Sequence, residues 1–275
     1  MAVQREAHLI AQSQQPVTTN SLIADLQNLG IQPASVLLVH SSLSKLGWVC
    51  GGPVAVVTAL EAVLGDQGTL VMPTHSGDNS DPADWSNPPV PSEWHAVIRQ
   101  NMPPYDPQLT PTRGMGRIVE TFRNQPGTLR SAHPQLSFAA RGPLAKFITE
   151  KHHPAIEMGE GSPLQKIYAL GGWILLLGVG HSNNTSLHLA EYRACYPSRK
   201  KQVNGCAMLV ENTPQWIQFE GLEFNDEDFP TIGSAFEAAN PHAFRHGNVG
   251  HADAALIHQP ALVDFAVNWM EKYRN

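Results

Sequence analysis

The first third of the chain alternates short apolar runs with segments of helical spacing. Residues 21–29 (SLIADLQNL) repeat apolar side chains at helical intervals and stop at Gly30, a residue type that commonly ends helices. The runs SVLLVH at 35–40 and GTLVMP at 68–73 predict two buried strands, and PVAVVTALEAVLG at 53–65 predicts the helix between them. This strand–helix–strand order is typical of a parallel sheet that binds ligands at the carboxyl ends of its strands.

The same pattern continues through the middle of the chain. Helices are predicted at 116–124 and 143–151, and a strand is predicted near 137–140. Residues 172–178 (GWILLLG) form the most hydrophobic segment of the chain. We expect this segment to be a central strand of the sheet.

The last third begins with a helix predicted at 185–194 (TSLHLAEYRA), where Thr185 is placed to cap the first turn. Two runs of short alternation between 201 and 224 meet around the turn residues 212–214, which predicts a β-hairpin. Residues 260–273 predict a terminal amphipathic helix that starts with proline.

These elements predict the fold class. We expect one α/β domain over residues 1–275, in which a central mixed, largely parallel sheet is flanked by helices and carries a β-hairpin excursion. Residues 1–17 are interpreted as a polar leader to this domain.

A long segment at 74–113 interrupts the pattern. It is rich in Pro, Asp, Asn and Ser, yet it contains Trp85, Trp94 and Tyr105, which a solvated linker would not need. We interpret it as a folded functional loop or lid.

Composition narrows the function classes. A chain of 275 residues with 42% hydrophobic residues can bury a substantial core, and its net charge of −6 argues against a nucleic-acid partner. The absence of a long apolar run and of a secretion signal predicts a cytoplasmic protein without a membrane partner. We expect it to be a monomer or a homodimer. Three cysteines without CxxC spacing imply neither a disulfide framework nor a structural zinc site.

Several short motifs suggest other chemistries and lack the context that each requires. Gly178 and Gly180 half-resemble a dinucleotide loop, but Asn183 stands at the third glycine position. Residues 202–207 (QVNGCA) fit the pyrophosphate loop of the common acetyltransferase superfamily, but a hairpin follows instead of a helix. HxH, HExxH and GxSxG are absent, which argues against a metal centre and a serine hydrolase.

Polar residues gather where the predicted strands end. The segment HSSLS at 40–44 follows the first strand, Thr74 and His75 follow the second, and residues 181–188 follow the central one. Since the carboxyl ends of parallel strands share one edge of a sheet, these segments are expected to line a single crevice. Each serine has an alternative role as a cap of its turn.

Six blocks in this order carry a resemblance over residues 23–272: VLLVHSSLSKLGWVCGG, GTLVMPTHSG, LTPTRGMGRIVETFR, RSAHPQLSFAARG, GEGSPLQKIYALGGWILLLGVG and NTSLHLAEYRA. Together they resemble the aminoglycoside 3-N-acetyltransferase family. The resemblance implies an α/β fold distinct from that of the common acetyltransferase superfamily. It also implies transfer of an acetyl group from acetyl-CoA to the 3-amino group of an aminoglycoside antibiotic, on its 2-deoxystreptamine ring.

The resemblance also implies the site residues. The blocks HSSL and TPTRGMG correspond to the acetyl-CoA site of the family. The polar residues at the strand ends and in RSAHPQLSF are added to it because they are expected to line the same crevice. The candidate cofactor-binding residues are His40, Ser41, Ser42, Leu43, Thr74, His75, Thr110, Thr112, Gly114, Met115 and Ser137. No metal is implied.

His188 of the HLAE block matches the catalytic histidine of the family, and Glu191 follows it at a spacing that puts both on one helix face. An amine attacks a thioester only as the free base, so a neutral imidazole within hydrogen-bonding reach is a suitable general base. Glu191 is expected either to orient the His188 ring or to help bind a cationic substrate. No Ser-His-Asp grouping is evident, which favours direct transfer within a ternary complex.

The acceptor is the least determined part of the function. Asp78 and Glu93 in the long loop and Asp228 beyond the hairpin are candidates to bind a cationic amine, although a solvated face is the alternative for each. His181 and Ser182 stand where the family commonly has an aromatic residue and an aspartate. An alternative acceptor is therefore a different small metabolic or nucleotide-linked amine.

Overall fold

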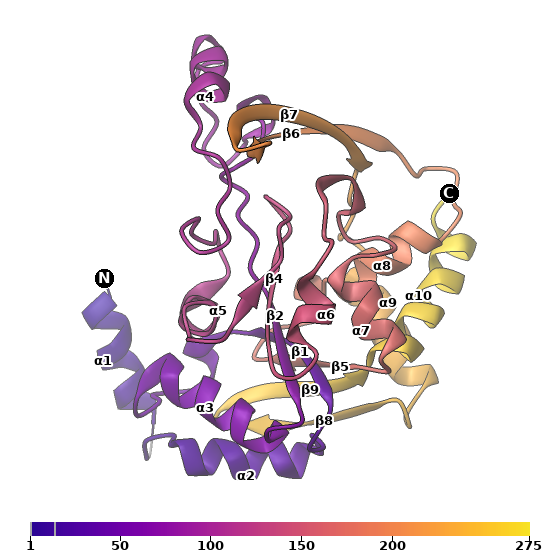
Figure 1. Ribbon diagram of the computed structural model, residues 1–275. Coiled ribbons are helices and arrows are strands. Elements are labelled where there is room, and N and C mark those ends of the chain that lie inside the picture. Colours follow the sequence, from indigo (N-terminus) through magenta and orange to yellow (C-terminus); the bar gives the residue numbers. More distant parts are fainter. Residues whose placement is uncertain (1, 14) are drawn as a thin grey trace.

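Seven strands form one mixed sheet in the computed structural model, which describes residues 2–13 and 15–275 (Figure 1). Their order across the sheet is β3-β4-β2-β1-β5-β9-β8. The strands are β1 (Val36–Ser41), β2 (Thr69–Pro73), β3 (Leu129–Arg130), β4 (Phe138–Arg141), β5 (Trp173–Leu177), β8 (Phe244–Val249) and β9 (Ala252–His258).

Helices cover both faces of the sheet. One face is covered by α2 (Thr19–Leu29), α3 (Gly52–Leu64) and α5 (Gly116–Arg123). The other face is covered by α6 (Ala145–Thr149), α7 (Pro163–Ala169), α8 (Ser186–Arg193), α9 (Phe229–Ala239) and α10 (Gln259–Tyr273). The result is a three-layer α/β/α arrangement, which is the architecture that buried strands require.

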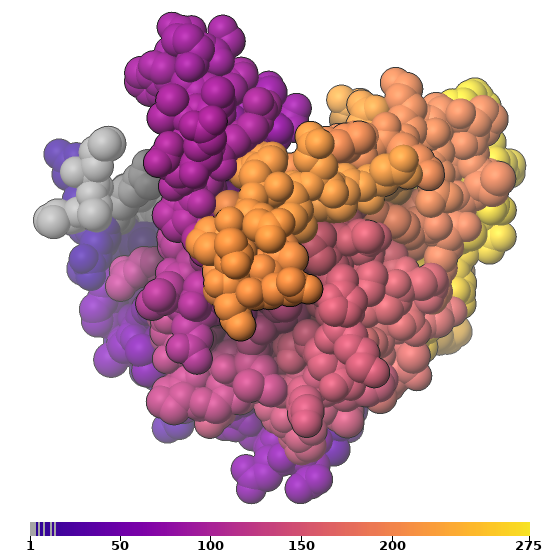
Figure 2. Space-filling model, turned by 45° about the horizontal axis from the view of Figure 1, so that its top comes forward, coloured from indigo at the N-terminus to yellow at the C-terminus, as the bar shows by residue number. Residues whose placement is uncertain are grey.

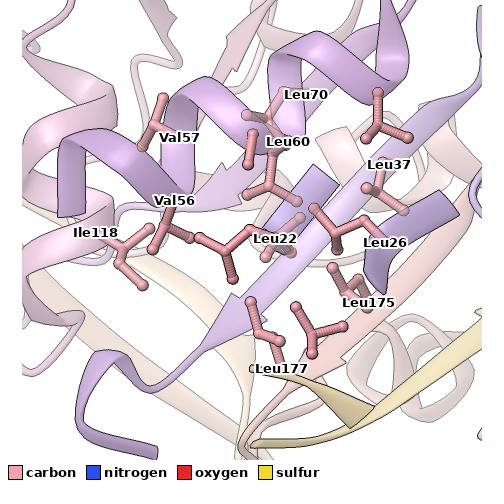
Figure 3. Close-up of a cluster of buried hydrophobic side chains, with 14 of the residues drawn as sticks. Leu22, Leu26, Leu37, Val56, Val57, Leu60, Leu70, Ile118, Leu175 and Leu177 are labelled. Carbon is pink, nitrogen blue, oxygen red and sulfur yellow. The ribbon is translucent and has the colours of Figure 1, made fainter. Parts of the chain in front are cut away.

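The two hydrophobic layers follow from the alternation of side chains along each strand. In β1, Leu37 and Val39 pack with α2 and α3, whereas Val36 and Leu38 pack against the opposite layer of helices. Figure 3 shows the first layer, in which Leu60 of α3 lies among leucines of α2, β1 and β5.

The long loop and the hairpin stand on the same edge of the sheet. The hairpin pairs β6 (Lys201–Val210) with β7 (Thr213–Leu222), and the loop contains η2 (Pro82–Asp84), η3 (Ser92–Trp94) and α4 (His95–Asn101). Asn79 joins the two, because its side chain donates to the carbonyl of Ala207 over 2.9 Å and accepts from the amide of Ala207 over 2.8 Å. In Figure 2 the arm that carries α4 projects beside the hairpin.

Most predicted elements are confirmed: the paired strands β1 and β2, the central strand β5, the hairpin, and the helices α2, α3, α5, α6, α8 and α10. The α/β class and the mixed sheet are confirmed as well. The expected largely parallel pairing is limited to the centre, where β1 pairs with β2 and β5 in parallel. The flanking pairings are antiparallel: β4 pairs with β2 and β3, and β9 pairs with β5 and β8. Short connections join β3 to β4 and β8 to β9, as antiparallel neighbours allow.

Three details differ from the expectations. Thr185 precedes α8 in a right-handed conformation and makes no side-chain capping bond, so its predicted role as a cap is wrong. The predicted polar leader contains helix α1 (Ala2–Gln12), and Val17 is buried and bonded through its amide to the carbonyl of Trp48. Trp94 is mostly exposed, whereas Tyr105 is buried and donates to the carbonyl of Ser131 over 2.8 Å.

Within the described residues, no helix combines the length and the apolar character that crossing a membrane requires.

Candidate active site

His188 and Glu191 form a close side-chain pair on α8. The Nδ1 atom of His188 lies 2.5 Å from Oε2 of Glu191, and the His188 side chain keeps 13% of its surface exposed while that of Glu191 is fully buried. The spacing of three residues puts both side chains on one face of the helix, as predicted. The imidazole is held between Phe224 and Phe229, at ring-centroid distances of 4.4 and 4.9 Å.

Glu191 takes its remaining contacts from segments far away in the sequence. Its Oε1 accepts from Nη1 of Arg274 over 2.6 Å and from the amide of Asn225 over 3.1 Å. Arg274 follows α10 and also binds Asp228 through two hydrogen bonds of 2.8 and 2.6 Å. Oε1 accepts two hydrogen bonds, so Oε2 is the oxygen that remains for His188. Since a carboxylate oxygen can only accept, Nδ1 of His188 is the donor and carries the imidazole proton.

Two buried histidines lie at the strand edge near His188. His40 lies one residue before the end of β1 and faces Thr185 over 3.4 Å, and His75 follows β2 with its Nε2 buried and without a hydrogen-bond partner among the described residues. Burial, and then the charge that His188 would carry, lowers the pKa of each from 6.5 to about 3. Both rings are therefore neutral at physiological pH.

A pocket of about 720 Å³ opens beside the carboxyl ends of β1 and β5 and is called here the strand-edge pocket. The predicted cofactor residues that line it are Ser41, Ser42, Leu43, Gly114 and Met115. The hydroxyl oxygen of Ser41 is buried there without a hydrogen-bond partner in the described part of the chain. A buried hydroxyl with free hydrogen-bonding capacity is suited to bind a polar group of a ligand.

A second pocket of about 340 Å³ lies between the long loop and the hairpin, and is called here the hairpin pocket. His75, Arg113 and Phe224 are among its lining residues. Glu157 also lines it, and sequence reasoning did not identify this residue. Its side chain accepts hydrogen bonds from the Tyr192 hydroxyl, from Asn204 over 2.7 Å and from the amide of Leu222 over 2.9 Å.

Glu157 is nearly fully buried, and this burial raises the pKa of its carboxyl above the ordinary value. The backbone of Glu157 has a φ of 46°, a conformation that residues other than glycine rarely adopt. Such a backbone persists when its surroundings fix it, and it is frequent at functional sites. The single hint in the sequence is an acidic residue in an otherwise apolar stretch before the GEGSP motif.

The structure places the other predicted cofactor residues away from the strand-edge pocket. The Thr74 and Ser137 hydroxyls are buried against each other at 3.1 Å. Thr110 accepts from the amide of Asp106, and Thr112 binds Glu120. These side chains stabilise the loop and strand β4, and their contact with a cofactor stays a prediction.

The acidic candidates for the acceptor are dispersed. Asp78 is paired with Arg113 at the rim of the hairpin pocket. Asp228 is bound by Arg274, so most of its charge is already balanced. Glu93 is exposed in η3, on the projecting arm. Arginines bind two of the three candidates and the third lies on the projecting arm, so a role for Asp78, Glu93 or Asp228 in binding a cationic amine stays a prediction.

Among the side chains that the structure describes, no group of three or more His, Cys, Asp and Glu residues is arranged to hold a metal ion.

The comparisons with known proteins agree with the resemblance found in the sequence. A family model described as aminoglycoside 3-N-acetyltransferase matches residues 38–271. The chain is 45% identical to the SPbeta prophage-derived aminoglycoside N(3')-acetyltransferase-like protein YokD of Bacillus subtilis (strain 168), over 92% of each chain. It is 35% identical to aminoglycoside N(3)-acetyltransferase VII of Streptomyces paromomycinus, over 97% of this chain and 96% of the relative.

Solved structures extend the comparison. The crystal structure of YokD from Bacillus subtilis matches with a TM-score of 0.93 at 43% identity, over 97% of each chain. AAC-IIIb in a binary complex with CoASH matches with a TM-score of 0.83 at 32% identity, over 94% of this chain and 97% of that one. AAC-VIa bound to sisomicin matches with a TM-score of 0.83 at 27% identity, over 94% and 98%.

The buried histidines generate a prediction for stability. Between pH 6.5 and about 3, the unfolded chain binds a proton at His75 that the folded protein does not, so stability falls as the pH is lowered through this range. His75→Gln is expected to reduce the slope of the unfolding free energy against pH, between pH 6 and 4, by about 1.4 kcal/mol per pH unit. Urea titrations measure this slope.

The control is His246→Gln, because His246 is exposed on β8. It is expected to leave the slope close to that of the wild type. An unchanged slope in folded His75→Gln would show that His75 is accessible to protons in the folded protein.

Proposed function

Because the chain belongs to the aminoglycoside 3-N-acetyltransferase family and is an acetyltransferase, we propose that it acetylates the 3-amino group of an aminoglycoside, with His188 as the general base. The observation that carries this proposal is the 2.5 Å contact between Nδ1 of His188 and Glu191. With its proton held on Nδ1, the ring keeps a lone pair on Nε2, which is what a base needs.

The residues support a direct transfer from acetyl-CoA. The thioester supplies the acetyl group, and its sulfur is the leaving group. His188 accepts, at Nε2, the proton that the attacking amine loses, and Glu191 balances the imidazolium charge that forms. The same proton can then be given to the departing thiolate, so the base is regenerated after each turnover.

The cysteines support transfer without an acetyl-enzyme intermediate. Cys50 and Cys195 are exposed, and neither lines the two pockets. Cys206 is buried in β6, and burial raises the pKa of its thiol to about 12. A thiol in that environment is a poor nucleophile near neutral pH.

We assign the strand-edge pocket to acetyl-CoA. Its volume, its unpartnered Ser41 hydroxyl and the glycines at 114 and 116 leave room for a long, polar ligand. Arg117 lines the same pocket and offers a positive charge to the phosphates of CoA. A relative of similar fold is described as a complex with CoASH.

We assign the hairpin pocket to the acceptor. Glu157 lines its wall, and a cationic group entering the pocket would favour the ionised form of this buried carboxyl. The adjoining Asp78 lies at the rim, where a polycation can compete with Arg113 for it. A relative of similar fold is described as bound to sisomicin.

A smaller amine is the second candidate acceptor. Two of the three carboxylates expected to bind a polycation are paired with arginines, at Arg113 and Arg274. The hairpin pocket itself is small, at about 340 Å³. Thiol release from acetyl-CoA, measured with sisomicin and with a panel of small primary amines, distinguishes the two candidates.

His188→Ala is expected to lower kcat by at least about a hundredfold, because a general base contributes a rate factor of this size. Calorimetry should show unchanged affinity for acetyl-CoA, since His188 does not line the strand-edge pocket. Partial recovery is expected at high pH, where the free amine forms without help. His246→Ala is the control, and turnover of His188→Ala near the wild-type rate would exclude His188 as the base.

Ser42→Trp is expected to weaken acetyl-CoA binding by at least about tenfold, because the indole would fill part of the strand-edge pocket. Isothermal titration with acetyl-CoA measures this change. Ser92→Trp places the same ring on the exposed η3 helix and should bind acetyl-CoA normally. Equal affinities of the two folded variants would move the cofactor to another site.

Glu157→Gln is expected to raise KM for sisomicin about tenfold, the value of one hydrogen bond to a charged group, with a smaller change in kcat. The KM of the wild type should also rise with salt, because ionic contacts are screened. Glu160→Gln is the control, since Glu160 is exposed and pairs with Arg193. Unchanged KM in Glu157→Gln would remove Glu157 from the acceptor site.

A further inference from the structure

Arg274 is the cation that compensates the buried charge of Glu191. The Arg274 side chain is 6% exposed, and its guanidinium reaches Glu191, Asp228, the Tyr196 hydroxyl and the carbonyl of Asn225. It also lies over the Tyr196 ring, at 5.2 Å from the ring centroid. A planar guanidinium with several donors suits a site that must bind two carboxylates at once.

The two carboxylate oxygens of Glu191 bind different partners. Arg274 and the amide of Asn225 bind Oε1, and His188 binds Oε2. The positive charge of Arg274 acts on the His188–Glu191 pair through its direct contact with Glu191, and it disfavours a further proton on that pair. Without Arg274 the pair would hold a proton more readily, and a base that already holds a proton cannot accept one from the amine.

We propose that Arg274 is a positioning residue for the acetyl transfer: it orients Glu191 towards Nδ1 of His188, and its charge disfavours a further proton on the His188–Glu191 pair before the amine arrives. This inference rests on the proposed role of His188 as the base. Arg274 acts through Glu191 and lines neither the strand-edge pocket nor the hairpin pocket.

The charges around His188 make the direction of the effect definite. Titratable and charged groups from several elements surround the His188–Glu191 pair. They are His40, His75, Glu157, Arg274, Tyr196 and Asp228. His40 and His75 stay neutral, so among these groups Arg274 is the cation whose charge disfavours a further proton on the His188–Glu191 pair. Asp228 binds Arg274 and offsets part of this charge.

Removing the charge of Arg274 and removing that of its partner Asp228 should therefore shift the titration midpoint of the His188 ring in opposite directions. Arg274→Gln leaves Glu191 without a cation, so the midpoint of the His188 ring titration should rise by about one pH unit. Asp228→Asn leaves the charge of Arg274 less compensated, so the midpoint should fall by a smaller amount. Nitrogen-detected NMR of the imidazole measures both midpoints in the full-length protein, without any acceptor.

The controls separate this inference from the function on which it rests. Arg193→Met removes another arginine that pairs with a glutamate, at the surface of the same helix as His188, and should leave the midpoint unchanged. An unchanged midpoint in folded Arg274→Gln, or a raised midpoint in Asp228→Asn, would overturn the role of Arg274. If Arg274→Gln does not fold, the direction of the shift in Asp228→Asn decides the question.

The pH dependence of turnover is a second test of the role of Arg274. With sisomicin as acceptor, the acid limb of kcat/KM against pH should move to higher pH in Arg274→Gln, and Arg274→Lys should restore part of the shift. Wild-type turnover in His188→Ala would refute the proposed base, whatever the NMR shows. Loss of turnover in His188→Ala, together with an unshifted Arg274→Gln, would refute the positioning role alone.

Discussion

The parallel pairing of β1 with β2 and β5 is the constraint on which the rest of the molecule depends. Parallel neighbours need crossover connections, and those crossovers supply α3 and α5 on one face of the sheet and α6 and α7 on the other. The same pairing brings the carboxyl ends of the three strands to one edge. His40, His75 and the segment leading to α8 therefore meet, although long stretches of chain separate them.

The parts of this structure that could be predicted from the sequence are those with a local sequence pattern. The strands β1, β2 and β5 are short apolar runs, the hairpin has a clear turn, and His188 and Glu191 are neighbours on one helix. Sequence reasoning did not identify α9, β8 and β9. The strand β8 is mostly polar, and Asp228, which stands at the start of α9 before a proline, was interpreted as a candidate to bind substrate.

Contacts between distant segments account for what the sequence did not reveal about the site. Arg274 lies 83 residues beyond Glu191, and Glu157 enters the hairpin pocket because three donors from other segments bind its carboxylate. Which carboxylates are free to bind a substrate depends on which arginines reach them. Asp78 and Asp228 resembled free acids in the sequence, and Arg113 and Arg274 neutralise them in the fold.

The amide of Asn79 pairs with the backbone of Ala207 as a neighbouring strand would, and so it joins the long loop to the hairpin. The two walls of the hairpin pocket are therefore not independent parts. A change of sequence that shifts one wall displaces the other through this link. Divergence towards new acceptors should then occur by coupled substitutions in residues 74–113 and 201–224, so these two segments of the gene are expected to evolve together.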